Sequence, residues 1–272
     1  MKYVEVRGMK APALGMGTWQ LQGRPCRQAV ERALELGYRH IDTAQMYGNE
    51  EMVGAALQAS GLPRDEVFLT TKLGLDDLAR DAVARTTRES LKRLATDRID
   101  LLLIHWPSDR VPLGETLEAM MALQEEGVVS HIGVSNFPPA LLREALHMAP
   151  VSCIQVEYHP YLAQPELLDM SRRRDLMLTA YSPLARGRVP GDRVLRQLAE
   201  RHGKTPSQVA LRWLIQQDHV SAIPKASSEA HLRENIDIFD FQLKPEEMRM
   251  IWELDRGERL LDPPWAPDWD RT

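Results

Sequence analysis

A carboxylate, a phenol, an ammonium group and an imidazole occupy positions in this sequence that indicate chemistry rather than packing. Asp42 ends a short apolar run, and Tyr47 follows it in a small-residue turn. Lys72 and His105 end two later apolar runs. If these runs are parallel strands of one barrel, their carboxyl ends meet at a single mouth. We therefore expect the four side chains to share one pocket.

Each of the four residues also has an ordinary structural explanation. A strand-end lysine is usually solvated, a histidine after an apolar run is more often a hydrogen-bonded core residue, and Asp42 could cap its own turn. The tyrosine could simply pack. Their coincidence at one mouth favours a proton-donating group, in which Asp42 and Lys72 satisfy each other beside the phenol.

A free phenol titrates near pH ~10 and is a weak acid for neutral conditions. An ammonium about 4 Å away, at an effective dielectric near ~20, favours phenolate by up to ~4 kcal/mol. We therefore expect Lys72 to lower the Tyr47 pKa by up to ~3 pH units. Such a phenol suits the reduction of a carbonyl by hydride, with Tyr47 as general acid.

The elements that would position these groups alternate along the chain. Most of the strand-like runs are continuously apolar, as expected of strands covered on both faces. Eight such runs are expected, at 14–18, 38–42, 67–72, 99–105, 131–135, 153–157, 176–181 and 220–224. Amphipathic helical segments lie between them, for example 80–94, 115–126 and 140–147. This alternation predicts an α/β protein with a closed (β/α)8 TIM barrel. A doubly wound sheet is the alternative, but the first βα turn lacks the G-x-G-x-x-G fingerprint.

Additional elements are expected at both ends of the barrel. Residues 1–14 predict a hairpin turned at Arg7 and Gly8. The interval 182–219 has room for two helices, 192–202 and 206–217, and Thr205 with Gln208 predicts a capping box for the second. Two more helices are expected at 229–235 and 245–254. Without a linker, a repeat or a low-complexity region, residues 1–272 are interpreted as one domain.

Composition excludes several classes of protein. The chain has 272 residues, 43% of them hydrophobic, and a net charge of −5, which argues against disorder and against a nucleic-acid partner. Its two cysteines have no metal-ligand spacing and are interpreted as reduced structural thiols. No signal-like segment or run of about 18 apolar residues occurs. We expect a cytoplasmic protein without a membrane partner.

A longer motif surrounds Asp42 and Tyr47. It reads Gly37-Tyr38-Arg39-His40-Ile41-Asp42-Thr43-Ala44-x-x-Tyr47-x-Asn49-Glu50 and resembles the signature of the aldo-keto reductases. Further similar blocks follow in order, namely Thr71-Lys72, Leu103 to Pro107, Ile132 to Phe137, Gln155 to Glu157, Tyr181 to Leu184 and Ile223 to Lys225. The resemblance extends from Gly15 to about Leu243.

This resemblance implies a (β/α)8 barrel that reduces small-molecule carbonyl substrates with NADPH, bound without a Rossmann fold, and works as a monomer. Asp42, Tyr47, Lys72 and His105 match the catalytic tetrad. The implied cofactor-binding residues are Gly17, Thr18, Ser135, Asn136, Gln155, Tyr181, Ser182, Leu184, Arg186, Lys225, Ala226, Ser227, His231 and Asn235. Ser135, Asn136 and Gln155 would hold the carboxamide, and nicotinamide would stack on Tyr181. Trp19, Met46 and Trp106 would line the substrate pocket.

The adenosine-phosphate segment departs from the family pattern. NADPH-dependent relatives usually carry a serine after Ile-Pro-Lys and arginines at the third and sixth positions beyond the lysine. Ala226, Ser228 and His231 stand there instead. Arginine is the preferred bidentate ligand of a phosphate, and Lys225 alone supplies only a point charge. We expect NADPH use with weak discrimination, so that NADH is accepted as well.

The segments expected to surround the substrate are short. The loop from Trp106 to Glu115 is brief and the chain ends soon after Trp269, so we expect an open pocket of low selectivity. The tail from Arg259 to Asp270 is similar to that of bacterial 2,5-diketo-D-gluconate reductases, a branch that also reduces methylglyoxal and simple aldehydes.

Two other classes of function fit the sequence less well. A non-catalytic nicotinamide-nucleotide-binding protein on the same scaffold has no physical need for all four of Asp42, Tyr47, Lys72 and His105. A metal-dependent barrel hydrolase needs clustered ligands, but none of the eight histidines forms an H-x-H or H-x-x-E-H group. Carbonyl reduction is the function that the sequence favours.

Overall fold

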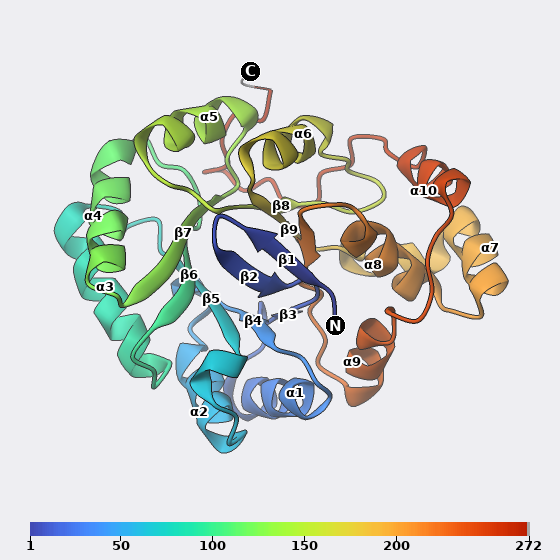
Figure 1. Cartoon of the computed structure of the whole chain (residues 1–272), viewed down its shortest axis with the longest axis horizontal. Coiled ribbons are helices and arrows are strands. Elements are labelled where there is room, and N and C mark those ends of the chain that lie inside the picture. The colour runs from blue at the N-terminus through green and yellow to red at the C-terminus, as the bar shows by residue number, and fades with distance from the viewer. Residues whose placement is uncertain (271–272) are drawn as a thin grey trace.

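Parallel strands form a barrel surrounded by helices in the computed structural model, which describes residues 1–270 (Figure 1). The eight strands are hydrogen-bonded in chain order from β3 to β10. They are β3 (Met16–Gly17), β4 (His40–Asp42), β5 (Phe68–Leu73), β6 (Ile99–Ile104), β7 (Val129–Ser135), β8 (Cys153–Glu157), β9 (Met177–Tyr181) and β10 (Val220–Ala222). Their side chains are almost all buried, as expected of strands that face a core on one side and helices on the other.

Backbone pairing between the first and last strands closes the barrel. Leu14 bridges to Ala222 and Gly17 to Lys225, both in parallel. The Gly15 N–H donates to the Ala222 carbonyl at 2.9 Å. A Cβ on Gly17 would lie 2.8 Å from the Ile223 carbonyl oxygen, so the close approach requires glycine. The prediction of a (β/α)8 barrel is confirmed.

The strands at this seam are shorter than expected. β3 covers Met16–Gly17 rather than 14–18, and β10 covers Val220–Ala222 rather than 220–224. Pro224 has no N–H to donate, so a regular ladder cannot continue through it. Isolated bridges replace regular strand pairing at the seam.

An antiparallel hairpin at the N-terminus crosses the near end of the barrel in Figure 1. It consists of β1 (Tyr3–Val6) and β2 (Met9–Pro12), and Arg7 and Gly8 form the turn with φ of 46° and 77°. Arg7 fastens the turn to the barrel by donating to the Val151 carbonyl at 3.1 Å. The predicted hairpin is confirmed, except that β2 ends at Pro12.

Ten helices are found among the described residues. They are α1 (Gly23–Glu35), α2 (Glu50–Ala59), α3 (Arg80–Arg93), α4 (Leu113–Glu125), α5 (Pro139–Met148), α6 (Pro165–Arg174), α7 (Arg193–His202), α8 (Pro206–Gln216), α9 (Glu229–Ile236) and α10 (Pro245–Trp252). Thr205 and Gln208 form the predicted capping box of α8. α4 begins two residues earlier than expected, directly after Pro112.

Two further features bear on the class of protein. Cys26 and Cys153 are free and buried, in agreement with their interpretation as reduced thiols. Within residues 1–270, every helix is too short or too polar to cross a membrane.

Candidate active site

Two neighbouring strands hold a buried ion pair at the carboxyl end of the barrel. Asp42 is the last residue of β4, and Lys72 lies on β5, which pairs with β4 in parallel. The Lys72 Nζ donates to Asp42 Oδ1 at 2.5 Å and to the Thr43 carbonyl at 2.9 Å. The two side chains are only 1% and 2% exposed, so solvent hardly screens their interaction.

The phenol and the imidazole lie beside this pair. Tyr47 ends a 3₁₀ turn after β4, and its hydroxyl accepts a hydrogen bond from Lys72 Nζ at 3.4 Å. His105 directly follows β6, and its ring meets the Tyr47 ring edge-on at a centroid distance of 5.6 Å. The structure therefore brings the four predicted residues together, while their catalytic roles stay predictions.

The pKa of Tyr47 departs from the expectation made from the sequence. Burial raises it above its usual value, and this effect outweighs the opposing charge of Lys72. The expected lowering is thus wrong, because loss of solvent disfavours phenolate more strongly than the ammonium favours it. At neutral pH Tyr47 carries its proton.

Lys72 is charged, whereas His105 is neutral. Burial tends to lower the pKa of Lys72, but Asp42 and Tyr47 together raise it, so the ammonium remains charged. Burial, aided by the charge of Lys72, holds the pKa of His105 well below its usual range. The imidazole is neutral, and its buried Nδ1 has no hydrogen-bond partner among residues 1–270.

Amide side chains at the next strand ends link to these groups. Asn136 follows β7 with a left-handed φ of 63°, donates to the His105 carbonyl at 2.9 Å and accepts from the Tyr181 hydroxyl at 2.7 Å. Ser135 is buried next to it. Gln155 on β8 donates to Asp42 Oδ2 at 2.7 Å. This amide therefore orients the carboxylate, a contact that the sequence did not predict.

The loop after β9 contains the residues expected near the pyrophosphate. Ser182 and Arg186 have left-handed φ values of 48° and 50°, as does the intervening Ala185 at 48°. Leu184 is half-buried, whereas Arg186 is exposed and stacks over the Trp19 ring at 5.1 Å. Trp19 follows the buried Gly17, which ends β3, and the buried Thr18. The loop thus reaches across the mouth from β9 toward β3.

The segment expected to bind the adenosine phosphate lies between β10 and α9. Lys225, Ser227 and His231 are exposed, and Ala226 and Asn235 are buried. Ser228 caps α9 by accepting the His231 N–H at 3.3 Å. Two arginines that the sequence did not single out, Arg32 and Arg233, are both paired with Glu229.

The substrate side is covered more than its short loops suggested. Trp19 and Met46 are 38% and 48% exposed, but Trp106 is only 4% exposed. Trp269 of the C-terminal tail packs edge-on against Trp106 at a centroid distance of 6.2 Å. The tail therefore forms part of the wall, and the expected openness is limited to the Trp19 and Met46 side.

Glu157, Arg259 and Trp269 at this wall were not identified from the sequence as site residues. One signal was available for the first of them: Glu157 is a carboxylate at the end of a largely apolar strand, where the structure buries it completely. The tail has no helical or strand period that would have located the other two.

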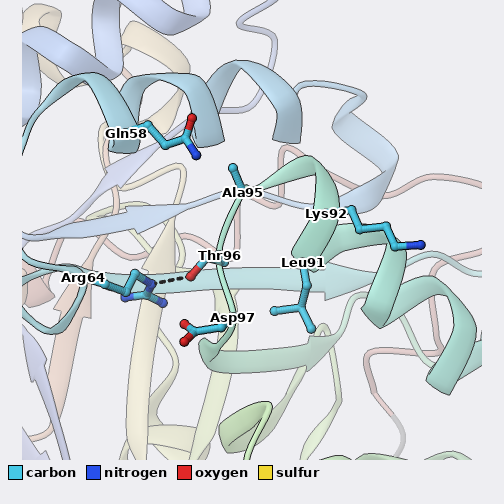
Figure 2. Close-up of a pocket in the computed structure, with 7 residues that line it drawn as sticks. All are labelled: Gln58, Arg64, Leu91, Lys92, Ala95, Thr96 and Asp97. Atoms are coloured by element: carbon cyan, nitrogen blue, oxygen red, sulfur yellow. Dashed lines mark hydrogen bonds between the residues drawn. The ribbon is translucent and has the colours of Figure 1, made fainter.

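Two hollows lie apart from the four central groups. A surface groove of about 580 Å³, lined by Gln58, Arg64, Leu91, Lys92, Ala95, Thr96 and Asp97, is shown in Figure 2. It lies at the amino ends of β5 and β6, the face of such barrels that serves stability. Arg64 is already bonded to Thr96 at 2.8 Å and Asp100 at 2.6 Å. A hollow of about 240 Å³ lies behind the loop after Trp106. Neither contains an acid–base cluster.

Comparison with known proteins identifies relatives of the whole chain. Residues 13–256 match the model of the aldo/keto reductase family. Methylglyoxal reductase DkgB of Escherichia coli O157:H7 is 38% identical over 268 residues, 96% of this chain and 100% of that protein. An aldo-keto reductase of Mycobacterium avium (strain 104) is 42% identical over 258 residues, 94% of this chain and 90% of that protein.

Solved structures agree with this relationship. A putative 2,5-diketo-D-gluconic acid reductase B superposes with a TM-score of 0.97 at 47% identity, covering 99% of this chain and 98% of that one. The aldose reductase from Schistosoma japonicum superposes with a TM-score of 0.95 at 31% identity, covering 100% of both chains. The family model, the sequence relatives and the shared barrel lead to one conclusion: the chain belongs to the aldo/keto reductase family.

Proposed function

We propose that this chain reduces aldehydes or ketones to alcohols with NADPH, accepts NADH as well, and uses Tyr47 as its general acid. Family membership supports an oxidoreductase that acts on carbonyls. The observation that carries the finer proposal is the hydrogen-bonded series from Asp42 through Lys72 to Tyr47, with neutral His105 beside it.

Proton donation follows from the charge states of these residues. The raised pKa of Tyr47 keeps the phenol protonated, so it carries the proton that a carbonyl oxygen needs. As this proton leaves, negative charge develops on the Tyr47 oxygen, 3.4 Å from the Lys72 ammonium. The ammonium is already in place and needs no reorganisation to stabilise that charge. Lys72 thus favours proton transfer without removing the proton from the resting enzyme.

The other two residues have supporting roles in this proposal. Asp42 keeps Lys72 charged and fixed, and Gln155 holds the second oxygen of Asp42. Because His105 is neutral, it can donate an N–H to the carbonyl oxygen without placing a second cation beside Lys72. The carbonyl oxygen would therefore lie between the Tyr47 hydroxyl and the His105 ring.

The residues at the mouth fit a nicotinamide dinucleotide, which supplies the hydride when bound. The half-exposed Tyr181 ring offers a stacking surface, and its hydroxyl is held by Asn136. The left-handed backbone at Ser182, Ala185 and Arg186 turns this loop at the mouth, where the exposed Arg186 would supply a positive charge for the pyrophosphate. Lys225 is exposed and would supply a charge for the 2′-phosphate.

The names of the relatives support a substrate class. One relative is named a methylglyoxal reductase, and one solved structure is named a putative 2,5-diketo-D-gluconic acid reductase B. We propose small aldehydes, methylglyoxal and keto-sugar acids as substrates of this chain, assayed by the loss of NADPH absorbance over such a panel.

The test of the general acid is Tyr47→Phe. This variant should lose about 10²- to 10⁴-fold in kcat, the usual contribution of a positioned acid, while binding NADPH as tightly as wild type. Tyr3→Phe changes an exposed tyrosine of the hairpin and serves as control with unchanged activity. Retention of most of the activity by Tyr47→Phe would contradict the proposal. Nucleotide binding without turnover in wild type would instead favour a non-catalytic binding protein.

A further inference from the structure

The C-terminal tail is anchored to the barrel by a buried carboxylate. Glu157 ends β8 and is completely buried. Its two oxygens accept the backbone N–H groups of Leu260 and Leu261, each at 2.9 Å, and Oε1 also contacts His159 Nε2 at 2.9 Å. These contacts fix the backbone immediately after Arg259.

The backbone before Arg259 is fixed as well. The Tyr161 carbonyl accepts the Arg256 N–H at 3.4 Å and the Glu258 N–H at 2.9 Å. Arg259 therefore lies between two anchored stretches of a segment that has no helix or strand of its own. Such anchoring limits the positions that its guanidinium can take.

Aromatic contacts place this guanidinium at the substrate side of the mouth. Its central carbon lies 3.6 Å from the centroid of the Trp269 ring, and Trp269 packs against Trp106. Trp106 directly follows His105, whose ring contacts Tyr47. Burial lowers the pKa of Arg259, while the nearby Tyr181 and Glu157 oppose this effect. Arg259 thus lies against the aromatic wall formed by Trp269 and Trp106.

Part of the guanidinium has no partner. Arg259 Nη1 is buried and makes no hydrogen bond to any residue in the range 1–270. Of the nearby carboxylates among the described residues, Glu157 holds the tail backbone, Asp262 Oδ1 accepts the Trp269 Nε1–H at 2.9 Å, and Asp270 forms no ion pair with Arg259. An unpaired charged donor is costly when it is removed from water, and a carboxylate is its natural partner.

We propose that Arg259 binds the carboxylate of the substrate, so that the enzyme prefers carbonyl compounds that carry an acid group over neutral ones of the same shape. This inference rests on the proposed carbonyl reduction and adds a specificity-determining residue to it. A keto-sugar acid would meet this requirement, whereas methylglyoxal has no group for Arg259 to bind.

Two acid and ester pairs test the preference. Phenylglyoxylate carries its carboxylate next to the carbonyl, and 4-carboxybenzaldehyde carries it across a ring; the methyl ester of each is the neutral counterpart. Wild type should show a higher kcat/KM for at least one acid than for its ester. Arg259→Met keeps the apolar stem but removes the charge. For the pair in which wild type prefers the acid, Arg259→Met should lower the acid-to-ester ratio of kcat/KM about 10- to 100-fold, mainly by raising KM for the acid.

Arg256→Met is the matched control. It removes a guanidinium from the same segment, but one already paired with Glu258 at 2.6 Å. The acid-to-ester ratio should stay within about twofold of wild type in this variant.

Other outcomes separate the inference from its alternatives. Equal losses for acid and ester in Arg259→Met would show a purely structural stacking role and overturn the inference. A higher KM for NADPH with an unchanged acid-to-ester ratio would assign the guanidinium to the nucleotide and overturn it too.

If wild type reduces neither these four compounds nor methylglyoxal, the proposed function fails. Calorimetric titration with benzoate then tests Arg259 separately. Binding about tenfold weaker in Arg259→Met supports a carboxylate site, and equal binding overturns it.

Discussion

Replacing Lys72 by methionine separates the two roles of this lysine. The substitution keeps a side chain of similar length but leaves Asp42 without its cation, in a place where the Asp42 side chain is 2% exposed. Of the two Asp42 oxygens, one keeps the Gln155 N–H and the other loses the bond of 2.5 Å to Nζ. Both stability and catalysis should therefore fall, for different reasons.

The loss of stability follows from the buried charge. Removing one partner of a buried pair costs about 3–5 kcal/mol, because the remaining charge is uncompensated. At roughly 2 °C per kcal/mol for a chain of this size, Tm should fall by about 8 °C. In the double variant Lys72→Met/Asp42→Leu no unpaired charge remains, so most of this stability should return.

The loss of activity follows from the distance to the phenol. A unit charge 3.4 Å from the Tyr47 oxygen stabilises phenolate by ~5 kcal/mol at an effective dielectric near ~20, as an upper estimate. The lysine variants should therefore lose about 10²- to 10⁴-fold in kcat. The double variant should be stable but as inactive as the single one.

Urea unfolding and steady-state assays on wild type and the variants measure both effects. A double variant no more stable than Lys72→Met would show that the unpaired carboxylate is not the source of the loss. Retention of about a tenth or more of the wild-type kcat by either variant would contradict the proposed role of the Lys72 charge.

Three further predictions concern the proton, the nucleotide and the tail. The pKa of Tyr47 lies above its ordinary value of 10.0, and reduction needs the protonated phenol. The value of kcat/KM for reduction should therefore stay level up to about pH 10 and fall above it. A fall in kcat/KM centred below about pH 9 would contradict this. Ser228 and His231 stand where NADPH-dependent relatives usually carry arginines, which leaves Lys225 to bind the 2′-phosphate. The preference for NADPH over NADH in kcat/KM should therefore stay below ~10⁴ at fixed ionic strength. A larger ratio would mean that another cation reaches the 2′-phosphate. Glu157→Gln loses the charge that holds two tail N–H groups, so the free energy of unfolding should fall by about 1–3 kcal/mol. Proteases should also cleave the tail faster, as measured by limited proteolysis with mass spectrometry. Equal cleavage rates in wild type and variant would mean that other contacts hold the tail.

The sequence alone determined the architecture and the four central residues. Continuous apolar runs such as Leu101 to Ile104 can be buried only between two covering layers, and their alternation with helices leads to a parallel barrel. Once strands are parallel, residues at their carboxyl ends must converge, so Asp42, Lys72 and His105 could be placed together without coordinates. The turn at Arg7 and Gly8 was also readable because it depends on local residues only.

Only the tertiary structure decided how strongly each group is shielded from water and which distant segment covers the mouth. The direction of the Tyr47 pKa depends on a balance between burial and the charge of Lys72, and burial is a property of all surrounding elements. Likewise, Glu157 brings Arg259 and Trp269 to the mouth through backbone contacts spanning about a hundred residues of sequence. Such contacts leave no periodic pattern in the chain, because they involve the backbone of an irregular segment rather than one face of a helix or strand.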